Sequence, residues 1–576
     1  MEVKKILLSS LAPLTVVSTI SLTTGCSKEE TLNTVMYWKA SKFANTITVF
    51  DASSLSKEWK VTLASLAGIL AQDKVQLFIK YGDERDNWFD DVRAKNGFKV
   101  DESITDVWQL LDKFKNTFDS KYILYSRNMQ KKGEEIVNMS TSINSACTIA
   151  AVKHYLVVDK ELEDEFQDEF IEHGFSQAYD ARNIKATDFF DNEESHKQLH
   201  QIRKQLSNKM LINQNPDNES LRDYAIASKS FISYVDYEYN YREQMVQWQH
   251  WVDTLANWLV PNAPILGWND GETDFVEYAS SKHLTTLASD HCKNLSFYTA
   301  DEGKKLSQRK QETITPDNNK HYLAIIMSDG DNAQWLQGNF INSTDYFGYD
   351  RSQYDFPMTW TVNPSVYDLC PTALEAIYKK QTEKDSFIAG PSGWAYINPS
   401  DYAVDHINEW KEINDRYMAD CDLSVINFLD WRKSDSNKLA PFMANKKIKG
   451  GVWSVADWYI GGNGSVSWVN DKPLLAMREG LWTLSGRTED RQFLNNIHVA
   501  NRINSYPRNP YSIEGYTCLI VHAWSLGKMP NIKDFVNLLK NDVQIISVEQ
   551  MIDMISKNVP HKDAAPEDYA FKHRDD

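Results

Sequence analysis

Residues 322–332 read Tyr-Leu-Ala-Ile-Ile-Met-Ser-Asp-Gly-Asp-Asn, and this stretch decides the fold class. Six residues without a charge or an amide stand in a row, and turn-forming residues follow at once. A short apolar run of this kind is typical of a strand buried on both faces, as the strands of parallel sheets are. The stretch therefore predicts one strand of a parallel sheet with a polar turn at its carboxyl end.

Similar apolar runs recur along the second half of the chain, with helical patterns between several of them. The helical patterns cover 372–378, 407–417 and 535–539. Strands that alternate with helices predict an α/β fold with parallel strands. Roughly seven or eight such units over 300 residues favour a closed or nearly closed (β/α) barrel, and an open doubly wound sheet is the alternative. The predicted strands are 265–268, 322–327, 358–362, 387–389, 423–429, 451–455, 517–521 and 543–547.

The first part of the chain shows the same alternation on a smaller scale, without a glycine-rich phosphate-binding fingerprint. The stretch 160–225 is highly charged, and we expect it to be helical. Apolar residues then recur at helical spacing until Pro261, which predicts a connecting helix. The predicted divisions are an N-terminal α/β domain (36–230), the connecting helix (231–263), a barrel-like catalytic domain (264–558) and a charged tail (559–576).

The amino terminus predicts a bacterial lipoprotein. Residues 1–25 combine two lysines with a mostly apolar stretch and end in a glycine just before Cys26. We expect cleavage there, a lipid on Cys26, a tether over 26–35 and anchoring in the cell envelope, in the outer membrane. Residues 27–30 resemble the surface-export signal of Bacteroidetes lipoproteins. The alternatives are a signal peptide with an incidental cysteine, an N-terminal membrane helix, and an ordinary tether that leaves the protein facing the periplasm.

Charge and composition restrict the function classes. The chain of 576 residues has a net charge of −18, which argues against nucleic acid and against a basic patch for anionic lipid. Beyond Cys26, the cysteines are widely spaced and form no CxxC pair, which predicts buried free thiols. The chain has 18 Trp and 27 Tyr, and many of the Trp stand in polar segments. Such rings suit core packing or the apolar faces of sugar rings, and both interpretations stay open.

Carboxylates follow the strand at 322–327, at the end where a barrel carries its functional face. Asp329 and Asp331 stand two positions apart, and Asn332 comes next. Two carboxylates at this spacing suit an acid/base pair or the ligands of a divalent cation, and no other cofactor is expected. The alternative is an Asp-rich turn that caps the following helix, since Asp, Gly and Asn favour turns for local reasons.

Other predicted strands end in a similar way, with a tryptophan beside a carboxylate, an amide or an imidazole. Glu272 follows one strand, Asp430 follows another and His522 a third. Because the carboxyl ends of parallel strands meet, we expect a polar pocket with aromatic walls. The expected substrate-binding residues are Trp268, Asp270, Asn332, Trp335, Trp360, Tyr396, Trp453, Asp457 and Trp524.

The loop that begins at Gly390 reads Gly-Pro-Ser-Gly-Trp-Ala-Tyr-Ile-Asn-Pro and resembles the signature of the GxGYxYP family, whose members are grouped with the glycoside hydrolases. Ala395 and Asn398 stand where the family has its second Gly and its second Tyr. The signature positions that match are Gly393, Tyr396 and Pro399.

Three further segments support the resemblance, which runs from about residue 36 to 555. It implies carbohydrate processing, with an oligo- or polysaccharide as partner, on an α/β domain followed by a barrel-like domain. The resemblance does not determine which reaction the protein catalyses. The supporting segments are 267–268, 328–332 and 360–364.

Three functions remain open. Glycoside hydrolysis needs two carboxyl groups about 5 Å apart for retention or about 6.5–9.5 Å apart for inversion, and we prefer Glu272 with Asp329 or Asp331 over the two aspartates together. Metal-dependent deacetylation of a polysaccharide would use an Asp base and His522 as acid, but no HxxxH pair follows residue 321. A glycan-binding lipoprotein without catalysis is the third. Both enzyme hypotheses require Glu272, Asp329, Asp331 and His522 to share one cleft.

Overall fold

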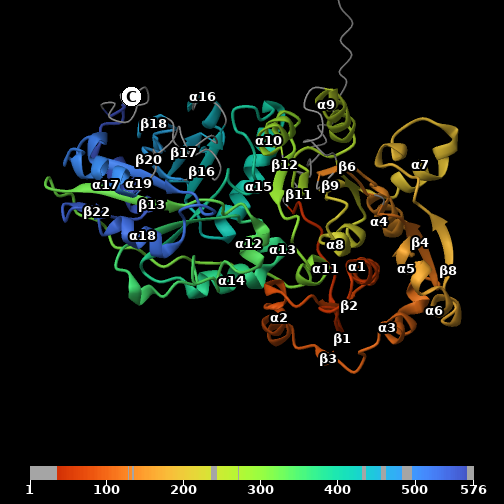
Figure 1. Ribbon diagram of the computed structural model, residues 1–576. Helices are drawn as coiled ribbons and strands as arrows, with labels where there is room; N and C mark the ends of the chain where they lie inside the picture. Colours follow the sequence, from red (N-terminus) through yellow and green to blue (C-terminus); the bar gives the residue numbers. More distant parts are fainter. Residues whose placement is uncertain are drawn as a thin grey trace, which may run out of the picture. The chain divides into compact units, whose positions relative to one another are not determined.

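The computed structural model describes most of the chain (Figure 1). The predicted signal peptide and Cys26 lie outside the described residues, as do Asp270, Trp431 and Asp457. Within the described part, no helix combines the length and the apolar content that crossing a membrane requires. The described residues are 35–127, 129–132, 135–234, 243–269, 271–430, 436–455, 462–482 and 496–566.

A large sheet forms most of the second half of the chain (Figure 1). Its strand order is β18-β19-β17-β16-β15-β14-β13-β21-β20, and β22 pairs with the start of β13. The strands run parallel except for β18 against β19. The strands are β13 (His321–Met327), β14 (Met358–Val362), β15 (Asp385–Ala389), β16 (Val425–Asp430), β17 (Gly450–Val455), β18 (Val466–Val469), β19 (Lys472–Ala476), β20 (Glu479–Leu481), β21 (Tyr516–Val521) and β22 (Val543–Ile545).

Strand β13 shows why an unbroken apolar run suits this sheet. All of its seven residues are buried. Leu323, Ile325 and Met327 belong to one apolar cluster, whereas the alternating residues, such as Tyr322 and Ala324, belong to another that includes α19 (Val548–Asn558). Because successive side chains of a strand point to opposite faces, both faces of β13 must be apolar. The prediction of a parallel sheet buried on both faces is confirmed for this strand.

Closure of the sheet into a barrel is not confirmed. Among the residues that the structure describes, β18 and β20 stand at the two ends of the sheet and do not pair with each other. The mixed α/β class with parallel strands holds, whereas the barrel rested only on the number of predicted units. One predicted strand belongs to a different sheet, and among the described residues the large sheet has ten strands, which include the unpredicted β18, β19 and β20.

The strand predicted at 265–268 does not belong to the large sheet. It forms β11 (Pro264–Gly267), which pairs with β9 (Ser207–Asn213) and β12 (Thr285–Ala288) in a separate parallel sheet of order β10-β9-β11-β12. Strand β10 spans Ser230–Ser233. An apolar run identifies a strand but not its neighbours, which depend on pairing between distant residues. The domain boundary placed at residue 264 stays a prediction.

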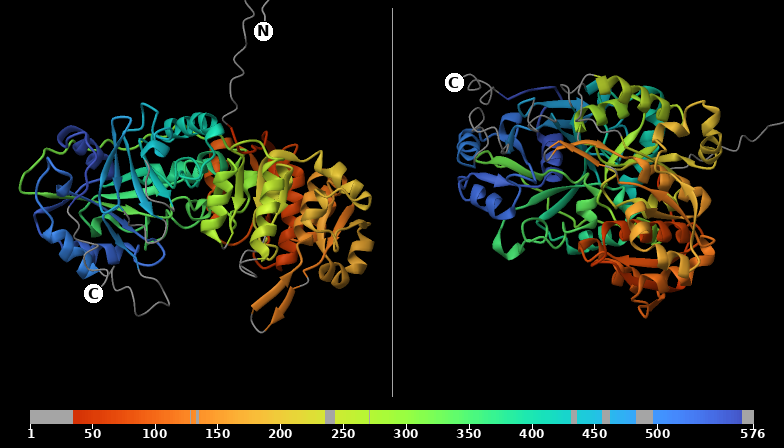
Figure 2. Two further views of the ribbon diagram at one scale, coloured as in Figure 1. Left: turned by 90° about the horizontal axis from the view of Figure 1, so that it is seen from above. Right: turned by 45° about the vertical axis from the view of Figure 1, so that its right-hand side comes forward.

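Two small parallel sheets precede this one. The first has the order β2-β1-β3 and the second the order β7-β4-β8. A hairpin of β5 and β6, orange in Figure 2, follows β4. The stretch 160–225, expected to be helical, also contains β8 and β9. The strands are β1 (Phe43–Asp51), β2 (Val75–Lys80), β3 (Lys99–Asp101), β4 (Lys121–Tyr125), β5 (Met129–Lys132), β6 (Glu135–Met139), β7 (Leu156–Asp159) and β8 (Ser176–Asp180).

Helices flank these sheets. Helix α1 is buried along almost its whole length because it packs against β2, β7 and α8 (Arg222–Ala227). The predicted connecting helix corresponds to α9, and Trp251 and Leu255 on it are buried. The helices of eight or more residues are α1 (Lys57–Ala71), α2 (Phe89–Asn96), α3 (Val107–Phe114), α4 (Ser142–Lys153), α9 (Glu243–Ala256), α10 (Glu272–Ser281), α14 (Pro371–Lys380), α15 (Ile407–Asp420), α17 (Asn496–Ser505), α18 (Met529–Val536) and α19.

The predicted state of the cysteines is confirmed where the structure describes them. Cys147, Cys292, Cys370, Cys421 and Cys518 are buried and carry free thiols. Burial raises the pKa of each thiol, so each behaves as a small apolar side chain.

Candidate active site

The turn after β13 is held against β14. Asp329 has a left-handed backbone (φ +66°), and the N–H of Gly330 donates to Thr361 Oγ1 at 2.9 Å. Thr361 in turn donates to the carbonyl of Met327 at 2.8 Å. A Cβ on Gly330 would lie 2.0 Å from the Thr361 carbonyl oxygen, so only glycine fits there. The two carboxylates therefore leave the strand from a turn with a fixed shape.

Asp329 accepts hydrogen bonds from two neighbours. The indole Nε1 of Trp524 donates to Oδ1 at 2.8 Å, and the Ser328 hydroxyl donates to Oδ2. Ser328 Oγ also accepts from the N–H of Ala523 at 3.1 Å. Because Trp524 and Ala523 come from the turn after β21, pairing of β13 with β21 helps to position Asp329.

Glu272 begins α10 and approaches from the four-stranded sheet. Tyr396 donates its phenol O–H to Glu272 Oε1 at 3.0 Å, and its ring stacks on Trp268 with centroids 6.1 Å apart. The backbone of Tyr396 exchanges two hydrogen bonds of 3.0 Å with Thr286 in β12. The loop that carries the family-like signature thus joins the large sheet to β12 and orients Glu272.

The pKa shifts of Glu272 and Asp331 show that these two groups and Asp329 lie near one another. Burial raises the pKa of Glu272 to about 7, the hydrogen bond from Tyr396 opposes this shift, and the negative charge of Asp329 adds to it. Burial also raises the pKa of Asp331 well above its usual range, and the charges of Asp329 and Glu272 reinforce the effect. Carboxyl groups that repel one another in this way are close in space, as an acid/base pair requires.

His522 lies near Asp329. Burial lowers the pKa of its imidazole, while the charge of Asp329 opposes this shift. Nδ1 lies 2.9 Å from Ser525 Oγ, and the ring stacks on Trp482 with centroids 4.3 Å apart. The structure therefore brings together all four residues of the predicted catalytic set.

Trp482 is a residue that sequence reasoning missed. It follows β20, which has only three residues and lacks the long apolar run that marks the other strands. A tryptophan directly after Leu481 was the available signal, since other strand ends also carry Trp.

Asn332 and Trp335, two of the predicted binding residues, support the ring of a third, Trp524. Asn332 caps α12 (Ala333–Gln337), because its side chain accepts from the N–H of Trp335 at 3.2 Å. The Trp335 ring is buried and packs on Trp524 with centroids 4.9 Å apart. Trp524 itself is 49% exposed, so it can present an aromatic face to a ligand.

Trp360 and Trp453 correct the predicted binding set, since both are buried in the core. Trp360 is fully buried, its Nε1 donates to Asp385 at 3.0 Å, and its ring contacts Phe340 and Phe347 edge to face. Trp453 is 1% exposed. Both side chains lie within a sheet that is covered on both faces, where a strand-end position does not imply access to a ligand.

Asp430 also has a structural role. It accepts from the N–H and the hydroxyl of Ser400 at 3.0 and 2.6 Å. Asp270 and Asp457 lie outside the described residues, so their predicted role in binding stays a prediction.

A group of three potential metal ligands occurs far from this site in the sequence. Among the described residues, the ligand atoms of Asp188, Asp191 and His196 lie within 4.8 Å of one another. A cation held by Asp329 and Asp331 alone stays a prediction.

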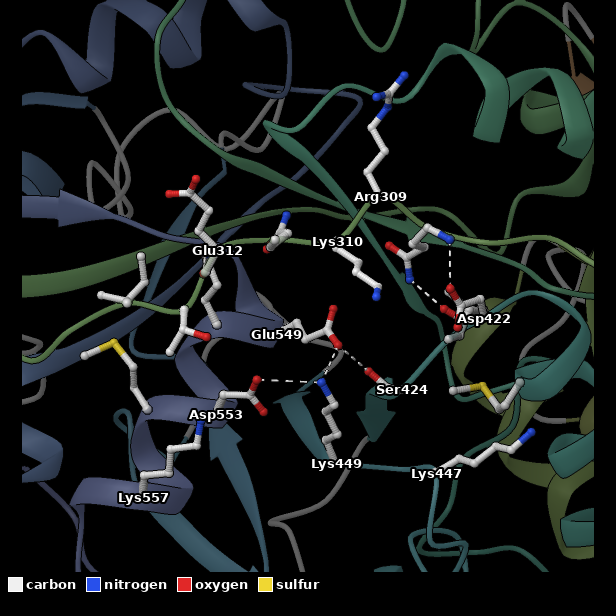
Figure 3. A pocket seen from close by; sticks show the side chains of 18 of the residues that line it. Arg309, Lys310, Glu312, Asp422, Ser424, Lys447, Lys449, Glu549, Asp553 and Lys557 are labelled. Atoms are coloured by element: carbon white, nitrogen blue, oxygen red, sulfur yellow. Dashed lines mark hydrogen bonds and ion pairs between the residues drawn. The ribbon is translucent and has the colours of Figure 1, made fainter.

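A groove of about 850 Å³ lies apart from the predicted catalytic residues and contains none of them (Figure 3). The segment 305–316 and α19 line it, together with several lysines. Lys449 is paired there with Glu549 at 2.6 Å and with Asp553 at 3.6 Å (Figure 3). The groove has no aromatic lining of the kind expected for a sugar site.

Comparisons with known proteins match most of the chain. Three family models match, described as the GxGYxYP first domain at residues 46–116, the third domain at 208–300 and the "GxGYxYP putative glycoside hydrolase C-terminal domain" at 319–556. The third-domain range contains β10, β11, β12 and all of β9 except its first residue, in agreement with the separate four-stranded sheet.

A solved structure has a similar fold. It is a crystal structure of "a putative hydrolase" from Bacteroides thetaiotaomicron VPI-5482, with 25% sequence identity and a TM-score of 0.77. The match covers 92% of this chain and 98% of that one. A comparison with curated proteins found no match.

Proposed function

Because this chain belongs to the GxGYxYP family, we propose that it hydrolyses glycosidic bonds with Glu272 as the general acid and Asp329 as its carboxylate partner. The observation that carries this assignment is the environment of Glu272. Burial raises its pKa to about 7, so it holds a proton near neutral pH. Asp329 accepts hydrogen bonds from Trp524 and Ser328, which hold its carboxyl group in place. A protonated acid and a second, positioned carboxyl group are what glycoside hydrolysis requires.

The remaining groups assist these two. Glu272 would protonate the leaving-group oxygen, and Tyr396 would orient its carboxyl group. Asp329 would act as nucleophile or activate water, depending on its distance from Glu272 in the substrate complex. Burial raises the pKa of Asp331, which favours its protonated form as a hydrogen-bond donor. Exposed Trp524 supplies an apolar surface for a sugar ring.

Kinetics of two variants test the assignment. Purified Glu272→Gln and Asp329→Asn proteins are assayed on a glycan panel and on aryl glycosides, with Glu383→Gln as a matched control at an exposed position. Loss of the acid should cost about 10²–10⁴-fold in kcat on natural glycans, but far less on aryl glycosides, whose leaving groups need no proton. Asp329→Asn should abolish both activities. If Glu272→Gln lowers kcat equally on natural glycans and on aryl glycosides, Glu272 is not the general acid.

A second candidate is metal-dependent deacetylation, which the position of His522 beside Asp329 favours. The same glycan panel separates the two reactions. Release of acetate that stops with chelator identifies deacetylation, whereas new reducing ends identify hydrolysis. Binding of a glycan without either product identifies a binding protein.

The protein is proposed to act while anchored in the cell envelope, through a lipid on Cys26. The support is the sequence of residues 1–30. Cys26→Ser should abolish incorporation of labelled fatty acid and release the protein from the membrane fraction. Unchanged labelling in this variant would rule out the anchor, and protease treatment of intact cells distinguishes surface from periplasm.

A further inference from the structure

A second set of polar groups lies buried at the carboxyl ends of β4 and β7, apart from the catalytic residues. Tyr125 is fully buried and Asp159 is 1% exposed. Four polar atoms here have no hydrogen-bond partner among the described residues: Tyr125 Oη, Asp159 Oδ2, and Nε and Nη2 of Arg127. Buried polar atoms are nearly always satisfied, so four in one place point to a missing ligand or to ordered water.

The strand pairing brings these atoms together. Tyr125 and Asp159 are directly paired in the parallel register of β4 and β7, so both side chains emerge on the same face. Arg127 stands two residues beyond Tyr125. Burial raises the pKa of Asp159 to about 6, the charge of Arg127 opposes this shift and that of Glu58 adds to it, which shows that the three charges are near one another.

Asp159 and Arg127 each use only part of their hydrogen-bonding capacity within the protein. Asp159 Oδ1 caps α5 (Lys160–Glu165) by accepting from the N–H of Glu161 at 2.8 Å, which leaves Oδ2 unused. Nη1 of Arg127 pairs with Glu58 at 2.6 Å, which leaves the edge formed by Nε and Nη2 unused. The free atoms are therefore fixed in position before any ligand binds, which reduces the entropic cost of binding.

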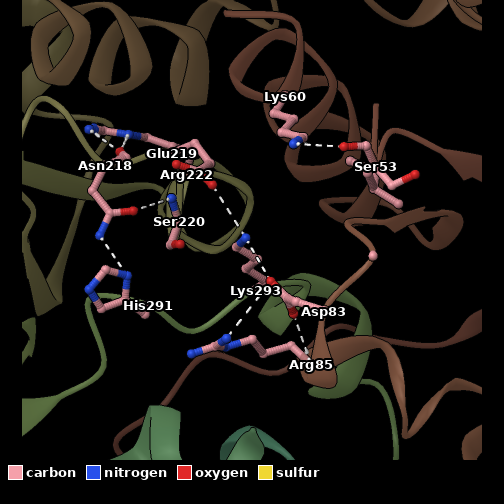
Figure 4. Close-up of polar contacts among 12 residues, drawn as sticks. Ser53, Lys60, Asp83, Arg85, Asn218, Glu219, Ser220, Arg222, His291 and Lys293 are labelled. Carbon is pink, nitrogen blue, oxygen red and sulfur yellow. Dashed lines mark hydrogen bonds and ion pairs between the residues drawn. The ribbon is translucent and has the colours of Figure 1, made fainter. Parts of the chain in front are cut away.

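A second buried arginine, Arg222, lies near these groups. Its guanidinium donates to the carbonyl of Asn218 (Figure 4) and to Asn144 Oδ1. The side chains of Arg127 and Glu58 are 18% and 24% exposed, whereas the unused Nε and Nη2 atoms of Arg127 are buried. The carboxyl ends of parallel strands are also where α/β sheets bind ligands.

The donors and acceptors restrict the ligand. The Nε and Nη2 edge of an arginine offers two parallel N–H donors, which suit a carboxylate, a phosphate or two adjacent hydroxyl oxygens. Asp159 Oδ2 needs a donor in return. A phosphate or sulfate would leave that oxygen unsatisfied and would place a negative charge beside Asp159 and Glu58. A hydroxyl both donates and accepts, so two or three adjacent hydroxyls can satisfy all four atoms.

We propose that Tyr125, Arg127 and Asp159 form a second carbohydrate-binding site, which takes a neutral sugar through adjacent hydroxyl groups. Two hydroxyl oxygens accept from Arg127, one of these hydroxyls or its neighbour donates to Asp159 Oδ2, and Tyr125 Oη completes the set. The site does not depend on hydrolysis at Glu272 and Asp329, because it shares no residue with them.

Ligand-observed NMR on the full-length protein tests the proposal. The probes are glucose, galactose, mannose, xylose and N-acetylglucosamine, each added singly, with inorganic phosphate as the anion probe. At least one sugar should bind, with its affinity lowered about tenfold or more in Arg127→Lys, which keeps the charge but loses the two-donor edge. Glu272→Gln should leave this binding unchanged, and Arg127→Lys should leave the rate of glycan hydrolysis unchanged.

Tyr125→Phe separates binding from stability. Since the Tyr125 hydroxyl has no partner among the described residues, its removal should leave the unfolding midpoint equal or higher, while sugar affinity falls. Sugar binding that is insensitive to both variants, absence of binding by all five sugars, or binding of phosphate alone at Arg127 would each overturn the assignment. Failure of glycan hydrolysis would not affect this result, so the two proposals can fail separately.

Discussion

The raised pKa of Glu272 makes a prediction about stability that needs no substrate. An unfolded glutamate has a pKa of 4.5, and the folded protein holds this group at about 7. Between these values the folded state keeps a proton that the unfolded state releases, so Glu272 lowers the stability of the protein progressively as pH rises from about 4.5 to 7. Below this range the penalty is absent, and above it the penalty is complete.

The magnitude follows from the shift. One pKa unit corresponds to about 1.4 kcal/mol, so a shift of about 2.5 units gives about 3 kcal/mol, which solvent screening of this partly exposed group reduces to about 2 kcal/mol. Glu272→Gln keeps the shape of the protonated acid and can still accept from Tyr396. The variant should therefore match the wild type at pH 4.5 and exceed its free energy of unfolding by about 2 kcal/mol at pH 8.

Urea unfolding at pH 4.5, 6 and 8 measures this difference, with Glu383→Gln as the control. The exposed control should show no difference from the wild type that depends on pH. A constant difference between Glu272→Gln and the wild type at all three pH values, or a less stable variant at pH 8, would show that Glu272 is not held protonated by its surroundings.

Three further predictions concern the same site. Activity should decline above about pH 7 as Glu272 loses its proton, which a pH profile of kcat/KM records. Gly330→Ala should cost about 1–3 kcal/mol or more, because its Cβ would overlap the β14 backbone, and urea unfolding measures the loss. Trp524→Ala should reduce activity with little change in stability, since the ring is half exposed and bonds to Asp329. Trp360→Ala should lower the free energy of unfolding by about 3–5 kcal/mol, because that ring is fully buried. Initial rates and thermal unfolding distinguish the two variants.

Most of the proposed catalytic cluster was predictable from the sequence because it depends on what directly follows each strand. Asp329 and Asp331 follow a strand that is apolar on both faces, and such a strand is recognisable without its neighbours. His522 follows β21 in the same way. Glu272 was harder to predict, because it follows β11 in the separate four-stranded sheet. Its hydrogen-bond partner Tyr396 comes from the loop after β15 in the large sheet.

The errors share a physical cause, since each required knowledge of pairing between distant residues. Short strands such as β20, and strands with exposed polar ends such as β8, do not have the continuous apolar run that identifies the others. Trp360 and Trp453 stand near strand ends, as Trp524 does, but lie inside a sheet covered on both faces. The sequence does not distinguish the buried rings from the exposed one, because burial depends on which helices cover the sheet.

The hydrogen bond between Trp524 and Asp329 also has a consequence for biosynthesis. The two residues are 195 positions apart, and β13 gains its neighbour β21 only after that whole stretch has been made. Until then, one edge of an apolar strand has no pairing partner, which is a state that invites aggregation. A chain truncated before residue 516 should therefore depend on holdase chaperones, and limited proteolysis should degrade it faster than the full-length chain.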